Sequence, residues 1–125
     1  MVNSALWLDL SSKEDLQELL SHSQNIPCLI FKHSTQCSIS AMALLRLESR
    51  LKSSSIAFSP YKLLLLEHRA ISNEIAQMFN VQHESPQVLL IYQGVCIYDE
   101  DHLDISFDEI EEYVASLNIV AEGIV

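Results

Sequence analysis

The chain has 125 residues, of which 49% are hydrophobic, and only two glycines and three prolines, a globular composition rather than a disordered or fibrous one. Seventeen acidic against seven basic residues give a formal net charge of −10, which disfavours binding to nucleic-acid phosphates and anionic lipids. The N-terminus has no basic leader, and the longest apolar run, 63–66, is too short to cross a bilayer. We therefore expect a soluble, cytoplasmic protein with no nucleic-acid or membrane partner.

The three cysteines are Cys28, Cys37 and Cys96. Their number is odd, and no two of them are separated by only two residues, so the sequence predicts neither a disulfide framework nor a zinc site. In a reducing compartment each cysteine has to be judged by its own surroundings.

The first half of the chain alternates helix and strand signals. A capping-box pattern, in which serines precede acidic residues by three positions, predicts a helix at about 12–22. The apolar run 27–32 predicts a central strand, and apolar residues at helical spacing then predict a long amphipathic helix starting just after Cys37. The next apolar run, 61–67, predicts a strand covered on both faces.

The second half of the chain predicts two helices around a hairpin. Ser72 is expected to cap a short helix. Residues 87–92 and 95–98 have strand composition and are separated by the two-residue turn Gln93-Gly94, which predicts an antiparallel hairpin. A second capping box beginning at Ser106 predicts a last amphipathic helix.

This order of elements predicts an α/β protein of thioredoxin-like fold, with a mixed four-stranded sheet and helices on both faces. The helical crossovers give parallel strands, and the closing hairpin adds antiparallel ones. We expect a single domain over 1–125, with its core at about 7–117 and a short C-terminal tail.

Cys37 is the candidate nucleophile. It lies between a predicted buried strand and the first turn of a helix, where unpaired N–H groups and the positive end of the helix dipole favour the thiolate anion. Ser40 stands where a two-cysteine oxidoreductase carries its resolving thiol, so a mixed disulfide on Cys37 has to be resolved by a second molecule. The alternative is that Cys37 is only a small buried apolar residue.

Ser85-Pro86 is the second candidate feature of the site. A cis bond here would expose the main chain of Ser85 beside Cys37, where an extended substrate can pair with it; a trans proline that starts a strand is the alternative. His33 and His83 can approach Cys37, either to favour its thiolate or to complete a metal site, but we expect no bound metal. Cys28 and Cys96 lie in predicted strands and are expected to be packing residues.

Three blocks of sequence resemble the monothiol bacilliredoxin-like YtxJ family, and the likeness extends over about residues 7–117. Two of these blocks are specific because they occur together at the expected separation. They are Lys32-His33-Ser34-Thr35-x-Cys37 and His83-Glu84-Ser85-Pro86-Gln87, with Glu67-His68-Arg69-Ala70-Ile71-Ser72-Asn73 as the third.

The resemblance implies a thioredoxin-like fold and a thiol–disulfide oxidoreductase that reduces mixed disulfides between bacillithiol and client-protein cysteines. It implies that Cys37 is the active cysteine and Pro86 the cis-proline, with bacillithiol as a transient covalent partner and no tightly bound cofactor. The residues expected to bind substrate or shape the site are Thr35, Ser38, Ser40, Ser85 and Pro86. The family usually has proline directly after the cysteine, whereas Ser38 here restores an N–H group and offers a hydroxyl to the thiolate.

Two other functions are compatible with the sequence. One is a noncatalytic thioredoxin-like interaction module, in which Cys37 is buried and the acidic surface binds a basic protein. The other is a metal or iron–sulfur carrier that uses Cys37 together with a small thiol, by analogy with one-cysteine glutaredoxins.

Overall fold

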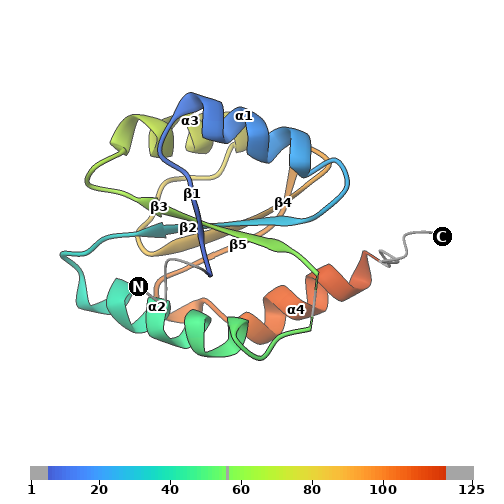
Figure 1. Ribbon diagram of the computed structural model, residues 1–125. Helices are drawn as coiled ribbons and strands as arrows, with labels where there is room; N and C mark the ends of the chain where they lie inside the picture. The colour runs from blue at the N-terminus through green and yellow to red at the C-terminus, as the bar shows by residue number, and fades with distance from the viewer. Residues whose placement is uncertain (1–5, 56, 118–125) are drawn as a thin grey trace.

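The computed structural model describes residues 6–55 and 57–117 (Figure 1). The elements in chain order are β1 (Leu8–Asp9), α1 (Lys13–His22), β2 (Cys28–His33), α2 (Ser38–Leu51), β3 (Ser59–Leu64), α3 (Arg69–Phe79), β4 (Gln87–Tyr92), β5 (Val95–Asp101), the 3₁₀ helix η2 (His102–Asp104) and α4 (Phe107–Ser116). Within these described ranges, no helix is both long enough and apolar enough to cross a bilayer.

The five strands form one mixed sheet in the order β1-β3-β2-β4-β5. The strands β1, β3 and β2 are parallel, whereas β4 runs antiparallel to both β2 and β5. The sequence predicted four strands, and the additional strand, β1, pairs only Leu8 and Asp9 with β3. A two-residue strand is too short to show a period-two pattern, which is why sequence reasoning missed it.

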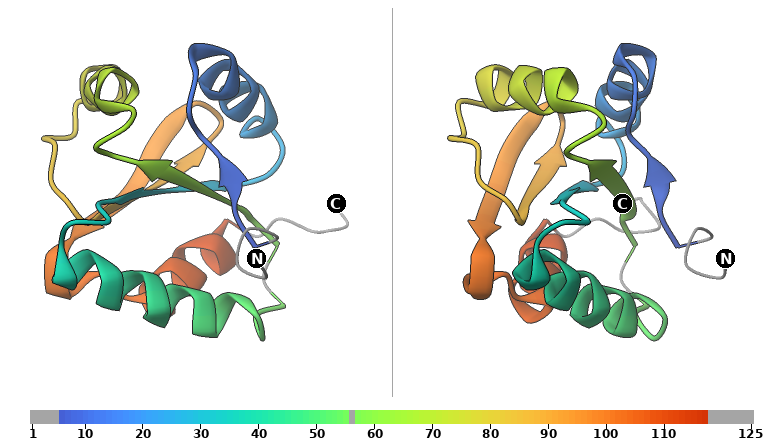
Figure 2. Two further views of the ribbon diagram at one scale, coloured as in Figure 1. Left: turned by 60° about the vertical axis from the view of Figure 1, so that its left-hand side comes forward. Right: turned by 90° about the vertical axis from the view of Figure 1, so that its left-hand side faces the viewer.

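Helices cover both faces of the sheet, as predicted: α1 and α3 lie on one face, and α2 and α4 on the other (Figures 1 and 2). Each side has its own apolar core, because the central strand β2 is buried along its whole length and alternates its side chains between the two faces. On the α2/α4 side the core includes Trp7, Leu29, Phe31, Leu47, Leu90 and Phe107. On the α1/α3 side it includes Leu16, Cys28, Ile30, Leu63, Ile75 and Leu89.

Local chemistry explains several element boundaries. The hydroxyl of Ser12 accepts the N–H of Asp15 at 3.0 Å, and that of Ser106 accepts the N–H of Glu109 at 3.3 Å, so both predicted caps are confirmed. Gln93 and Gly94 both have positive φ, 54° and 76°, as the tight turn of the β4–β5 hairpin requires.

Two predicted boundaries were wrong. Helix α3 begins at Arg69 rather than after Ser72, which lies inside the helix and is fully buried. The predicted strand 61–67 is displaced to Ser59–Leu64 and includes Pro60. The main-chain N–H groups of Ser59 and Leu65 donate to residues on the β2 side of the strand. Because main-chain groups alternate in direction along a strand, the nitrogen of Pro60 faces β1 instead. Strand β1 pairs only with Tyr61 and Lys62, so no N–H donor is needed at Pro60.

The cap at Ser106 provides a test of how α4 is held. We expect Ser106→Ala to lower the free energy of unfolding by about 1 kcal/mol, because the N–H of Glu109 loses its acceptor. Urea denaturation measures this difference. Ser106→Asp, which keeps an acceptor, should remain close to wild type, and equal losses in both variants would contradict the capping role.

Candidate functional site

The candidate site lies at the edge of the sheet where β2 ends and β4 begins. The last pair in the ladder between these antiparallel strands is Lys32 with Gln87. The loop that follows β2 leads to Cys37, and Ser85-Pro86 directly precedes β4. The register therefore brings the Cys37 loop and the Ser85-Pro86 segment to the same end of neighbouring strands. In sequence, Cys37 and Ser85 are 48 residues apart.

Cys37 is the N-cap residue of α2 and is partly exposed. Its backbone is extended, with φ −120° and ψ 123°, and its carbonyl accepts the N–H of Ala41 at 3.0 Å as the first bond of the helix. The first turn of α2 has no acidic side chain, so no carboxylate there competes for the positive end of the helix. The unpaired N–H groups of this turn are therefore available to an anionic group that lies next to Cys37.

Ser40 is fully buried in the first turn of α2, and it fixes the loop that leads to Cys37. Its Oγ accepts the N–H of Ser34 at 3.0 Å and lies 2.7 Å from Nδ1 of His33. His33 is stacked on Phe31, with ring centroids 5.4 Å apart. Burial, with a further contribution from the charge of Lys62, lowers the pKa of His33, which keeps the imidazole neutral at pH 7. The position of a resolving thiol is thus occupied by a hydroxyl that anchors the loop.

The Ser85-Pro86 bond is cis, which confirms that prediction. Pro86 is buried, and its carbonyl accepts the N–H of His102 in η2 at 2.9 Å. The buried hydroxyl of Ser85 has no hydrogen-bond partner among the described residues. Nor does the main chain of Ser85 form any hydrogen bond within the ranges 6–55 and 57–117.

The other two predicted site residues lie on the surface. Thr35 is exposed in the turn between β2 and α2, and Ser38 is exposed as the first residue of α2. Thr35 precedes Cys37 by two residues and Ser38 directly follows it, and both side chains are open to solvent. Of the predicted set, Ser40 and Pro86 are buried, and Thr35 and Ser38 are accessible.

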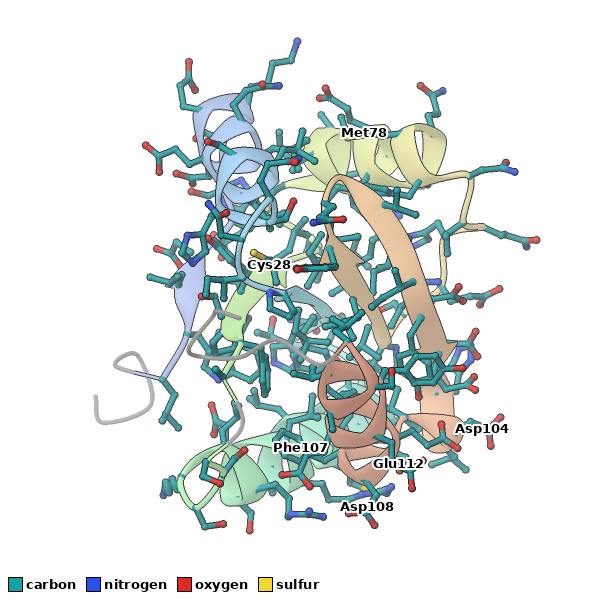
Figure 3. The ribbon with its side chains drawn as sticks, turned by 90° about the vertical axis from the view of Figure 1, so that its right-hand side faces the viewer. Cys28, Met78, Asp104, Phe107, Asp108 and Glu112 are labelled. Atoms are coloured by element: carbon teal, nitrogen blue, oxygen red, sulfur yellow. The ribbon has the colours of Figure 1, made fainter. Side chains whose placement is uncertain are left out.

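Cys28 and Cys96 differ from Cys37 in their surroundings. Cys28 lies in β2, inside the molecule (Figure 3), and burial raises the pKa of its thiol to about 12. Cys96 lies in β5, and burial raises the pKa of its thiol to about 11. A thiol reacts as its thiolate, so these environments disfavour reaction at neutral pH.

Lys32 is a feature that the sequence reasoning did not identify. It is fully buried at the end of β2, and its Nζ lies 3.3 Å from the carbonyl of Ser72 and 3.4 Å from Nδ1 of His83. Burial lowers its pKa from 10.5 to about 8. The available signal was a single charged residue in an otherwise apolar strand.

The described residues offer little for metal binding: between residues 6 and 117, with 56 left out, no three His, Cys, Asp or Glu side chains form a group suited to a metal ion. His33 is bonded to Ser40, and His83 is in contact with Lys32 and Ser72.

A cysteine that caps the helix after a central strand, together with a cis-proline directly before the neighbouring antiparallel strand, is the arrangement of a thioredoxin-fold protein with one cysteine at the start of that helix. Residues 8–110 match the monothiol bacilliredoxin BrxC family, and the chain belongs to this family. Its membership and its fold support a thiol redox function.

Solved structures share the thioredoxin fold of this chain. A thioredoxin-fold protein described as a candidate oxidoreductase is 28% identical with a TM-score of 0.77, and the match covers 90% of this chain and 96% of that one. Two thioredoxins share the fold. A mutant thioredoxin from Halobacterium salinarum is 16% identical with a TM-score of 0.67, and the match covers 87% of this chain and 88% of that one. Mitochondrial thioredoxin 3 from Saccharomyces cerevisiae is 17% identical with a TM-score of 0.67, and the match covers 88% of this chain and 94% of that one.

The environments of the cysteines predict selective alkylation. Burial raises the pKa of the Cys28 thiol to about 12 and that of the Cys96 thiol to about 11, so iodoacetamide should label the partly exposed Cys37 more than ~10-fold faster than either. Peptide mapping after short labelling times measures the three rates. Comparable labelling of Cys28 or Cys96 in the folded protein would contradict this assignment.

Lys32 predicts a pH dependence of stability. Its pKa is about 8 in the folded protein and near 10.5 in the unfolded chain, so between these values the unfolded state binds a proton that the native state lacks, and stability rises with pH. Relative to Lys32→Met, the wild type should gain about 2 kcal/mol of unfolding free energy between pH 7 and pH 10. Urea denaturation of both proteins across this range is the measurement, and a difference that stays constant with pH would contradict the lowered pKa of Lys32.

Proposed function

We propose that this protein is a monothiol oxidoreductase that removes a low-molecular-weight thiol, bacillithiol, from mixed disulfides on client proteins in the cytoplasm. The observation that carries the proposal is that Cys37 caps α2 while the position three residues later holds the buried hydroxyl of Ser40. The site thus has a nucleophile and no internal resolving thiol. Membership of the monothiol bacilliredoxin family supports bacillithiol as the small thiol.

The transfer step exchanges one disulfide for another. The thiolate of Cys37 attacks the bacillithiol sulfur of the mixed disulfide, a bond forms between these two sulfurs, and the original S–S bond breaks. The client cysteine leaves as a thiolate and takes a proton from water. Cys37 then carries the adduct until a second thiol attacks it, forms a new disulfide with the departing bacillithiol and restores the Cys37 thiolate.

The geometry also offers a docking edge for the client. The main chain of Ser85 has no hydrogen-bond partner in the described part of the chain, and it lies beyond the end of the β2–β4 ladder. An extended client segment can pair with such a free main chain and bring its modified cysteine toward the N-terminus of α2. Thr35 and Ser38, exposed on either side of Cys37, can then contact the small thiol.

The test follows both partners of the transfer. A client that carries a bacillithiol mixed disulfide is incubated with the wild type, Cys37→Ser, Cys28→Ser and Cys96→Ser, and intact masses of client and protein are recorded together. We expect the client to lose the adduct as the wild type gains it, one for one, because no internal thiol removes it.

The three variants separate the roles of the cysteines. Cys37→Ser should lose the transfer altogether, while Cys28→Ser and Cys96→Ser should retain it, since the pKa values of both of these thiols are raised. Full transfer by Cys37→Ser, or loss confined to either of the other variants, would contradict the proposal. Turnover should depend on the concentration of added free thiol.

A further inference from the structure

The two halves of the candidate site lie on segments that the sheet does not join. The ladder between β2 and β4 ends with the pair Lys32 and Gln87, so Ser85 and Pro86 lie outside it. The segment between α3 and β4, residues 80–86, has no strand or helix structure of its own. Contacts outside the β2–β4 ladder therefore contribute to its position relative to Cys37.

One partly buried cluster provides such contacts. Nζ of Lys32 lies 3.4 Å from Nδ1 of His83 and 3.3 Å from the carbonyl of Ser72, and the hydroxyl of Ser72 lies 3.2 Å from the same Nδ1. Lys32 comes from β2, Ser72 from α3 and His83 from the segment that leads to Pro86. Three separate parts of the chain thus meet at one imidazole nitrogen, three residues before the proline.

The hydrogen-bond roles in this cluster follow from its chemistry. A lysine ammonium only donates, so Nδ1 of His83 is the acceptor and the ring proton is on Nε2. Burial and the charges of Lys32 and Arg69 lower the pKa of His83, against an opposing effect of Glu84, so the imidazole stays neutral. Both the ammonium and the neutral ring are in the states that the contact needs at pH 7.

Further hydrogen bonds hold the same segment at its end. The side chain of Gln87, which is opposite Lys32 in the ladder, donates to the carbonyl of Gln82 at 2.9 Å. The carbonyl of Pro86 accepts the N–H of His102 at 2.9 Å. The cluster of Lys32, Ser72 and His83 ties the same segment directly to β2, the strand that leads to Cys37.

The cluster lies on the face of the sheet opposite α2. The Lys32 side chain reaches Ser72 of α3, on the α1/α3 side, whereas Phe31, its neighbour in β2, belongs to the core under α2 and α4. Lys32 is therefore separated by the sheet from the helix that Cys37 caps. This placement suits a residue that positions the docking segment rather than one that stabilises the Cys37 thiolate.

We propose that Lys32 and His83 are positioning residues that hold the Ser85-Pro86 segment beside Cys37 for docking of the client chain. The inference rests on the proposed function, because it assigns these residues to client binding at the same site. It also accounts for a lysine buried among apolar residues at the end of a central strand, where an apolar side chain would be accommodated without a desolvation penalty.

The experiment compares His83→Leu, His83→Asn and Lys32→Met with the wild type. His83→Asn places an amide oxygen near the position of Nδ1 and keeps an acceptor, whereas His83→Leu removes it. His22→Leu, on the exposed end of α1, is the matched control. For each protein, KM and kcat are measured with a disulfide-modified client, together with the rate of Cys37 alkylation against pH and the hydrogen exchange of residues 82–88.

We expect His83→Leu and Lys32→Met to raise KM about 10-fold, with kcat and the Cys37 alkylation profile within about twofold of wild type. His83→Asn and His22→Leu should keep KM within about twofold of wild type. Hydrogen exchange of residues 82–88 should be faster than in the wild type only in His83→Leu and Lys32→Met. If Lys32→Met does not fold, the comparison of the two variants at His83, which is only partly buried, decides the question.

Three results would overturn the positioning role. The first is an unchanged KM in His83→Leu, and the second is an equal rise of KM in His83→Leu and His83→Asn. The third is a change in how the alkylation rate of Cys37 depends on pH. If the wild type itself fails to take the adduct from a client, the proposed function fails. Hydrogen exchange still tests the positioning claim in that case: unchanged exchange of 82–88 in His83→Leu overturns it, and faster exchange reversed in His83→Asn supports it.

Discussion

The pairing of β2 with β4 is the constraint on which the site depends. These two buried strands are neighbours in the sheet, and their register ends at Lys32 and Gln87. That register fixes where the chain leaves β2 toward Cys37 and where it enters β4 from Ser85-Pro86. A shift of one residue would turn the buried side chains of either strand to the opposite face, so the two apolar cores hold the register in place. The packing of the core thereby determines the geometry of the site.

Most of the layout could be predicted from local patterns. The caps at Ser12 and Ser106, the turn at Gln93 and Gly94, and the start of α2 after Cys37 all follow from short-range chemistry. Errors arose where long-range contacts decide. Strand β1 exists only because β3 lies beside it, and Ser72 lies inside α3, where its carbonyl contacts Lys32 and its hydroxyl contacts His83. No local pattern contains such information.

Some residues of the candidate site could likewise be predicted from local sequence, and others could not. Position at a helix start singled out Cys37, and the resemblance to a family identified Pro86, but no local pattern assigned a role to Lys32. The contacts of Lys32 and Ser40 come from residues far along the chain or across the loop, and only the folded structure brings them together. Two polar residues next to the site, one on each side of the sheet, thus order the segments that flank Cys37: Ser40 fixes the loop before it, and Lys32 holds the segment across from it.

The central claim is that Cys37 carries a small thiol between clients and a second reductant. It is tested most directly by peptide mapping and mass spectrometry of the protein isolated from its own cell after oxidative stress, with free thiols blocked at lysis. The account predicts a bacillithiol adduct on the peptide that contains Cys37, with Cys28 and Cys96 recovered as free thiols. A Cys37 that remains unmodified while client proteins carry the adduct, or an adduct confined to Cys28 or Cys96, would contradict it.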